Sequence, residues 1–348
     1  MVKASRKTTE LQKILRRNAL AVNNEWHSIR SMLGHTWAIF YVLLGAREAG
    51  KSYAVMEYFL RCWKRRKQPF YWLRLNEAST RKMLVNNGEK LVDADLMRKY
   101  GLELTVKGTN VYDHGEKMCE VLALSTFYND KGVAHFDKDF DLGYNIALDE
   151  FQLEEAQKRQ GDICYQFINQ MENLVRSQKN KVRIFLIGNT LEEASDILTM
   201  FNFIPEEFGR YKLRKKRAIV DYLPPSEKYL TRRKGTIADL LAPQASNFTN
   251  KIDFDRSLIY KGRLVKPTMI IHFKSIKFTV WDGKIIAEWN KEKCDANIAM
   301  VPYIDLPFNT NLRDKVFELF DTRSFMYKNL ITNKKFQKEL QLLKPRKH

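Results

Sequence analysis

The sequence is short of cysteine, of long apolar runs and of acidic residues. Its 348 residues include four cysteines, with no C-x-x-C pair and no paired histidines beside them. This spacing argues against a zinc site and predicts reduced thiols in a cytoplasm. The longest apolar run is about ten residues, whereas a membrane span needs about twenty, so we expect no membrane insertion. The basic start of the chain lacks the apolar segment of a secretory signal.

Acidic residues are clearly outnumbered by basic ones. The chain has 41 Asp and Glu against 60 Lys and Arg, a formal net charge of +19. Such a charge is unusual for an enzyme of small metabolites and favours a polyanionic partner, either nucleic acid or an acidic membrane surface. The alternative is a basic protein whose charges only keep it soluble. The length predicts roughly two domains, each with its own core.

Apolar patterning predicts an α/β domain followed by a smaller domain, in which short strands lie close together along the sequence. Strands that alternate with helices indicate a mainly parallel sheet covered on both faces. The expected strands are 37–44, 69–75, 102–107, 118–124, 144–149, 182–188 and about 210–222, and the expected helices are 52–66, 93–100, 163–178 and 192–201. The predicted divisions are a basic helical extension over 1–30, the α/β domain over 31–223, a linker over 224–250, and an α+β domain over 251–348 that holds a meander with a DG turn at 282–283 and a helical stretch over 311–343.

The stretch from Gly45 to Ser52 fits G-x-x-x-x-G-K-[ST] at every position, after an apolar strand and at the start of a helix. The two glycines let backbone N–H groups turn toward a phosphate chain, Lys51 reaches the β- and γ-phosphates, and Ser52 ligates Mg²⁺. A helix-entry turn with an incidental lysine is the alternative. The predicted nucleotide-binding residues are Gly45, Ala46, Arg47, Glu48, Ala49, Gly50, Lys51, Ser52 and Tyr53.

A second apolar strand, YNIALDEF, ends in two carboxylates. Asp149 would hold Mg²⁺ and Glu150 would polarise the attacking water. An added glutamate is typical of ATPases and is missing from many small-molecule kinases. The alternative is a strand that ends in two solvated acids.

Two further polar residues stand at the ends of predicted elements. Asn189 closes the strand VRIFLIGN, where it would either contact the γ-phosphate or the water, or cap the next helix. Arg176 stands near the end of the helix 163–178. It would either reach the γ-phosphate of a neighbouring subunit or be a solvated cation at a helix end.

These motifs resemble the genome-packaging ATPases of the small, protein-primed tailed phages. The segments that carry the resemblance are LLGAREAGKSYAV, IALDEF, MENLVRS, IFLIGN and TRRKG. The resemblance implies a P-loop NTPase fold of the additional-strand, catalytic-glutamate type. It also implies a C-terminal domain like a degenerate ribonuclease H-like nuclease, and the first meander strand indeed lacks a carboxylate, so we expect no nuclease activity. The first 30 residues have no counterpart in the family.

The resemblance further implies an ATPase that drives double-stranded DNA into a phage procapsid. Its cofactors would be ATP and Mg²⁺, and its partners the DNA, the portal (connector) of the procapsid and four copies of itself in a homo-oligomeric ring, a pentamer, in the host bacterial cytoplasm. Whether a structural RNA joins is left open. Carried over by position, Lys51 and Ser52 match the P-loop, Arg47 an arginine inside it, Asp149 and Glu150 the acidic pair, Arg176 the arginine donated between subunits, and Asn189 the polar strand end.

DNA contacts and other function classes are open at this stage. Lys131, in the long segment 125–144, is our predicted DNA contact, although four aspartates share that segment. The run from Arg210 to Arg217 is denser in charge, but charges on an edge strand also protect it from aggregation. The alternatives to a DNA translocase are a P-loop kinase and a non-motor ATPase switch in replication or partition.

Overall fold

The computed structural model describes two units of the chain, each taken by itself below. Unit 1 comprises Met1–Phe201 and Pro205–Ile252, and unit 2 comprises Asn202–Ile204 and Asp253–His348. The residues described are 26–45, 48–132, 143–152, 162–175, 182–189, 196–241, 259, 269–273, 276–281, 284–289, 303–304, 325–327 and 330–333.

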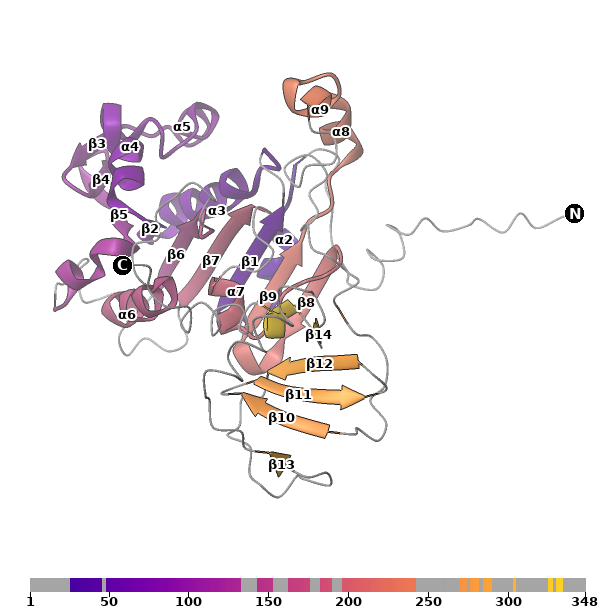
Figure 1. The fold of residues 1–348 in the computed structure, drawn as a ribbon. Coiled ribbons are helices and arrows are strands. Elements are labelled where there is room, and N and C mark those ends of the chain that lie inside the picture. Colours follow the sequence, from indigo (N-terminus) through magenta and orange to yellow (C-terminus); the bar gives the residue numbers. More distant parts are fainter. Residues whose placement is uncertain are drawn as a thin grey trace, which may run out of the picture. The chain divides into compact units, whose positions relative to one another are not determined.

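Unit 1 is built on a nine-stranded sheet of order β3-β4-β5-β2-β6-β7-β1-β9-β8 (Figure 1). The six strands from β5 to β9 in this order run parallel, while β3, β4 and β8 are antiparallel additions at the two edges. The strands are β1 Phe40–Gly45, β2 Phe70–Arg74, β3 Leu104–Lys107, β4 Asn110–Asp113, β5 Glu116–Ala123, β6 Tyr144–Asp149, β7 Val182–Asn189, β8 Gly209–Leu213 and β9 Ala218–Tyr222.

The strand order confirms the predicted fold class. β7 is inserted between β1, which precedes the glycine-rich turn, and β6, which ends in Asp149. This insertion defines the additional-strand type of P-loop NTPase. The two strands with the chemical motifs are therefore not neighbours, yet their carboxyl ends open on the same edge of the sheet.

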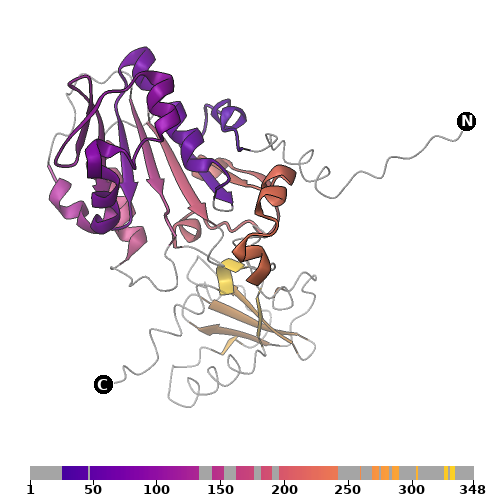
Figure 2. The same ribbon diagram turned by 90° about the horizontal axis from the view of Figure 1, so that it is seen from above.

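Helices cover both faces of the sheet (Figure 2). α3 packs on one face, where its residues Phe59 and Trp63 join a core with alternate residues of the strands. α7 lies on the other face, where Phe201, just after it, meets Phe40 edge-on. The helices of unit 1 are α2 Arg30–Leu33, α3 Lys51–Arg66, α4 Glu77–Gly88, α5 Ala94–Tyr100, α6 Ile163–Val175, α7 Asp196–Met200, α8 Glu227–Arg233 and α9 Ile237–Leu241, with 3₁₀ turns η1 Leu124–Asp130 and η2 Arg214–Lys216.

Local sequence explains where these helices begin and end. The Asn76 and Ser226 side chains accept from the backbone N–H of the third residue beyond them, which caps α4 and α8. α3 carries three basic residues in its last turn, where they favour the helix dipole, and ends at Lys67 in a left-handed conformation. Sequence reasoning missed α4, whose last turn is broken by non-helical Val85, Asn86 and Asn87.

Two predicted strands are wrong in extent. The strand expected over 102–107 is β3, and it forms a hairpin with the unpredicted β4. The single strand expected over about 210–222 is an antiparallel hairpin, β8 and β9, joined by the basic turn η2. The chain reverses here because Arg217 adopts a left-handed conformation (φ 50°) and its N–H donates to the Arg214 carbonyl.

Unit 2 contains a five-stranded sheet of order β13-β10-β11-β12-β14. Its centre is the predicted antiparallel meander, and the two short flanking strands are parallel to their neighbours. The strands are β10 Met269–Phe273, β11 Ile276–Trp281, β12 Lys284–Trp289, β13 Tyr303–Ile304 and β14 Phe325–Tyr327. The DG turn, nearly all of the predicted helical stretch 311–343, and residues 1–25 of the predicted basic helix lie outside the described residues.

Candidate nucleotide-binding site

Three parallel strands of unit 1 end together at one edge of the sheet. β1 ends at Gly45, which pairs in register with Asn189 at the end of β7. β6 ends at Asp149, paired with Ile187 of the same strand. The carboxyl ends of parallel strands are where open α/β sheets bind ligands. The fold thus brings together the residues of three separate sequence motifs.

The glycine-rich turn leads directly into α3. Gly50 has a left-handed backbone (φ 77°), and its carbonyl accepts the first helical bond, from Ala54 N–H at 2.9 Å. The N–H groups of the first helical turn therefore have no intrahelical acceptor and can receive an anion. The carbonyl of Ala49 accepts from the N–H of His27 at 3.1 Å, which ties the turn to the segment before β1. Ala46 and Arg47 lie outside the described residues.

Lys51 lies inside this turn. Its side chain is buried, and Nζ donates to the Gly45 carbonyl at 3.0 Å and to Oδ1 of Asn189 at 3.2 Å. The ammonium is thus held over the concave face of the turn, where phosphates would lie. Asn189 contacts Lys51 here. The alternative role, a cap for the next helix, involves residues 190–195, which lie outside the described part.

The hydroxyl of Ser52 donates to Oδ1 of Asp149 at 2.9 Å. Asp149 is nearly inaccessible, and this burial raises the pKa of its carboxyl, while Arg74, the Ser52 hydrogen bond and Lys51 act in the opposite direction. A cation bound at this position would reverse the shift, because it stabilises the carboxylate.

Arg74 is the site residue that sequence reasoning missed. It ends β2, next to β6, and its guanidinium forms an ion pair with Asp149 (Nη2 to Oδ2, 3.0 Å) and a second with Oε2 of Glu150. Glu150 has a left-handed backbone (φ 55°), and its side chain is 61% exposed. The signal in the sequence is an arginine at the end of the apolar strand FYWLR, but its partners depend on the strand order.

Two predicted residues remain, Arg176 and Lys131. Arg176 lies just beyond the described end of α6. Lys131 is exposed at the end of η1, next to residues 133–142, which the structure does not describe.

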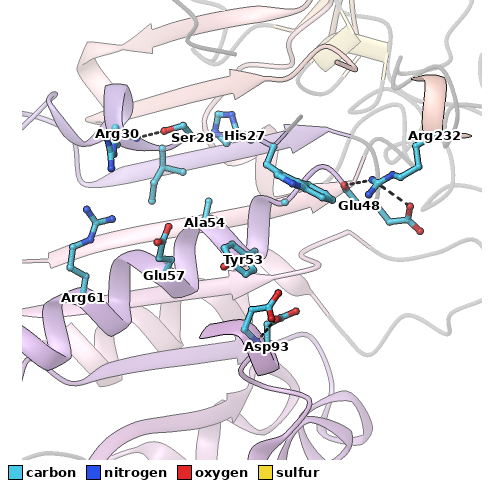
Figure 3. Close-up of a pocket in the computed structure, with 14 residues that line it drawn as sticks. His27, Ser28, Arg30, Glu48, Tyr53, Ala54, Glu57, Arg61, Asp93 and Arg232 are labelled. Carbon is cyan, nitrogen blue, oxygen red and sulfur yellow. Dashed lines mark hydrogen bonds and ion pairs between the residues drawn. The ribbon is translucent and has the colours of Figure 1, made fainter. Parts of the chain in front are cut away.

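A cavity of about 930 Å³ adjoins the glycine-rich turn (Figure 3). It lies along the outer face of α3, between the segment before β1 and the start of α5. Its half-exposed aromatic residues, Trp26 and Tyr53, stand near the turn, and acidic Glu57 and Asp93 line it farther along. Cavities of this size accommodate small ligands such as a nucleoside. The patterns used above gave no signal for it.

Helix α8 closes the turn end of this cavity. Arg232 stacks over the ring of Trp26 at 4.6 Å, and its Nη2 donates to the Glu48 carbonyl at 3.4 Å. The Glu48 carboxylate lies 3.9 Å from Arg232 and 3.7 Å from Arg233. Trp26 in turn covers Gly50, where an added Cβ would come within 3.2 Å of the indole. Helix α8, which follows β9, thus touches the glycine-rich turn directly.

A family profile described as "Podovirus DNA encapsidation protein (Gp16)" matches residues 25–285. The chain belongs to this family. The match spans the glycine-rich turn and, in unit 2, β10, β11 and the first two residues of β12.

Solved structures of packaging motors have the same fold as this chain. "The Phi-28 gp11 DNA packaging Motor" matches with TM-score 0.63 at 14% identity, over 94% of this chain and 100% of that one. "The bacteriophage Phi-29 viral genome packaging motor assembly" matches with TM-score 0.61 at 19% identity, over 91% and 99%. No curated protein matches the chain. Family and fold together identify an ATPase of DNA packaging and do not favour a kinase or a partition switch.

The donors at this edge fit Mg²⁺. Ser52 and Asp149 offer a hydroxyl and a carboxylate oxygen in contact with each other, and Mg²⁺ takes few protein ligands beside phosphates and water. No group of three His, Cys, Asp or Glu suited to a metal occurs among the described residues. This set is therefore suited to a metal that arrives with a nucleotide.

Proposed function

We propose that the chain is the motor subunit that hydrolyses MgATP to drive double-stranded DNA into a procapsid through its portal. The observation that carries the proposal is the contact between Ser52 and Asp149, because it joins the P-loop to the acidic strand across the inserted β7. Membership of the DNA encapsidation family supports the substrate.

In this proposal the residues at the carboxyl edge divide the chemistry. The N–H groups at the start of α3 and Lys51 bind the phosphate chain, and Asn189 orients the ammonium. Ser52 and Asp149 hold Mg²⁺, which would neutralise charge on the β- and γ-phosphates. Glu150 accepts the proton of the attacking water. To do so its carboxylate must release Arg74, with which it is paired here.

The cavity beside the turn would receive the base and ribose of ATP. It begins at Gly50 and Tyr53, where a nucleoside attached to phosphates on the turn would emerge. Trp26 and Tyr53 offer aromatic faces for stacking, which is worth roughly 1–3 kcal/mol per base.

The assembly is part of the proposal. A homo-oligomeric ring of five subunits, the portal as partner and Arg176 acting between subunits follow from the resemblance given above. Lys131 as a DNA contact follows from its place in the segment 125–144. A position on the procapsid in the host cytoplasm also follows from the resemblance, whereas the proposed domain limits follow from the patterning of the sequence. No helix in the described part is long and apolar enough to span a membrane. We propose no nuclease activity for unit 2, since β10 carries no carboxylate.

The test is phosphate release by the purified chain with and without linear duplex DNA, with analysis of all products. The expected result is ADP and inorganic phosphate, with hydrolysis that requires Mg²⁺ and rises when DNA is added. Transfer of the phosphate to a nucleotide or protein acceptor would establish a kinase instead. A single turnover, followed by stable retention of ADP regardless of DNA, would establish a switch.

A further inference from the structure

The hairpin of β8 and β9 concentrates positive charge at its turn. The last cross-strand pair is Leu213 with Ala218, and the four residues that connect them are Arg214, Lys215, Lys216 and Arg217. All four are exposed, as is Lys212 on β8. The only acid of the hairpin, Asp221, is buried and bound to Arg210 by two bonds of 2.7 Å, so it offsets none of the exposed charge.

The turn is a fixed platform rather than a loose loop. The Arg217 carbonyl accepts from the N–H groups of Ile39 and Phe40 at 2.8 and 3.1 Å, and its Nε donates to the Trp37 carbonyl at 3.1 Å. Arg214 stacks over the Trp37 ring at 4.2 Å. By contrast, no ion pair or hydrogen bond engages the side chains of Lys212, Lys215 and Lys216 within the part of the chain that the structure describes.

Protection of an edge strand does not account for this arrangement. Charges that protect an edge stand along the strand itself, beside its unpaired backbone groups. Here the four turn residues lie beyond the last ladder pair, and on the strand only Lys212 has that position. Several like charges held close together repel one another. A bound polyanion offsets this repulsion, and binding is favoured because the phosphates that the lysines neutralise release their counterions.

The turn also lies away from the nucleotide site. β9 runs parallel to β1 over five register pairs. The turn before β9 therefore lies at the amino ends of these strands, whereas the P-loop follows the carboxyl end of β1 (Figure 1). Five residues of strand correspond to about 17 Å. The pKa of nearby His35 is lowered, chiefly by burial. The positive charges of Lys212, Arg210 and Arg214 lower it further.

We infer that the β8–β9 turn is a second, sequence-independent docking surface for the phosphate backbone of double-stranded DNA, separate from the site of hydrolysis. The choice of DNA over other polyanions rests on the proposed function, since a packaging motor always meets the duplex. The surface itself rests on the charges and geometry of the turn. Lys212, Lys215 and Lys216 supply ammonium groups that have no ion pair or hydrogen bond among the described residues, while Arg214 and Arg217 hold the platform in place.

The experiment measures the salt dependence of duplex DNA binding by the full chain. A plot of log K against log [salt] has a negative slope for DNA binding. The triple variant Lys212→Gln, Lys215→Gln, Lys216→Gln should make this slope shallower by about 2 to 3, since each lost phosphate contact removes about 0.9. Affinity at 0.1 M salt should fall at least about tenfold. The matched control, Lys82→Gln, Lys90→Gln, Lys107→Gln, removes the same charge from exposed positions on α4, just after α4 and at the end of β3.

Each outcome decides the inference. The docking surface would be refuted if the slope became equally shallow in the Gln triple variant and in the matched control, or if it changed in neither. It would also be refuted if the Gln triple variant lost affinity for duplex RNA but not for duplex DNA. The triple Lys→Arg variant should keep the wild-type slope, and thermal melts of all variants exclude misfolding. Basal ATP hydrolysis should be unchanged in the Gln triple variant. If the wild-type chain hydrolysed no ATP but the slope fell as expected, the proposed function would fail and the docking surface would stand.

Discussion

At the carboxyl edge of the nine-stranded sheet, basic side chains have fixed partners: Lys51 contacts Asn189, and Arg74 bridges two carboxylates. The opposite end of the same parallel strands, where their amino ends lie, is called the amino edge here. There Lys215 and Lys216 are exposed and have no ion pair among the described residues. In the first arrangement Lys51 and Asp149 are buried, so salt affects their contacts little, as a reaction site requires. The second is exposed and strongly screened, as reversible contact with a long polyanion requires. The same residue types thus serve two different purposes according to their partners.

The largest expected effect tests whether one subunit supplies every catalytic group at the carboxyl edge, or whether a neighbouring subunit supplies an arginine. Arg176→Ala should leave nucleotide binding intact but reduce assembled hydrolysis by about 10³–10⁵-fold, the range for an arginine supplied to a γ-phosphate from outside. Mixing this variant with Glu150→Gln subunits should restore activity, because an Arg176→Ala subunit that keeps Glu150 receives the arginine of its neighbour. Continued inactivity in rings that contain both chains would contradict action between subunits.

Glu150→Gln comes next. The amide cannot accept a proton from water, so kcat should fall about 10²–10⁴-fold while ATP and DNA still bind. Steady-state kinetics and equilibrium binding measure the two properties separately. Glu89→Gln, an exposed glutamate after α4, is the matched control and should behave as wild type. A kcat within about threefold of wild type would exclude Glu150 as the base.

Arg210 and Lys212 sharpen the comparison within one strand. Arg210 is buried against Asp221, so Arg210→Ala leaves an unpaired buried carboxylate and should lower the free energy of unfolding by about 3–5 kcal/mol. Lys212→Ala should change it by less than about 0.5 kcal/mol. Urea unfolding of both variants provides the measurement. Similar losses for both would mean that Lys212 has a structural partner.

Removing one lysine from each edge compares them directly. Lys51→Ala should lower kcat at least about 10²-fold, by analogy with the loss of one preorganised donor to developing charge. Lys215→Ala should leave kcat unchanged and reduce the salt slope of DNA binding by about 0.9. Phosphate release and a salt titration on both variants check this. A salt-dependent defect in Lys51→Ala, or a loss of kcat in Lys215→Ala, would break the division between the edges.

The sequence predicted those parts of the site that depend on local spacing. The P-loop and the pair Asp149 and Glu150 are short patterns next to apolar strands, and their positions follow from the geometry of parallel sheets. Arg74 was not predictable in this way, because its partners are set by the pairing of β2 with β6. The cavity requires Trp26 and α8, which are far apart in the chain, to meet at the turn. The sequence predicts one strand where the hairpin at 209–222 stands, because a left-handed arginine in a turn is unusual.

The smallest expected effect concerns Arg232, which has features of both edges. It is 41% exposed, as a screened surface cation would be, yet it contacts Trp26 and the Glu48 carbonyl at the phosphate-binding turn. If contact with the turn decides its role, Arg232→Ala should weaken ATP binding about two- to fivefold. This corresponds to the roughly 0.5–1 kcal/mol of an exposed cation–π contact.

Competition against a fluorescent nucleotide at low and high salt measures this effect. Arg81→Ala is the matched control, since Arg81 is also an exposed arginine with one carboxylate partner, Glu77, but lines no part of the cavity. Stacking over Trp26 is less sensitive to salt than the ion pair with Glu48, so most of the difference should persist at 0.5 M salt, where the Debye length is only about 4 Å. A difference that vanishes at high salt would assign Arg232 to the screened class of the amino edge, and no difference at any salt would separate α8 from nucleotide binding.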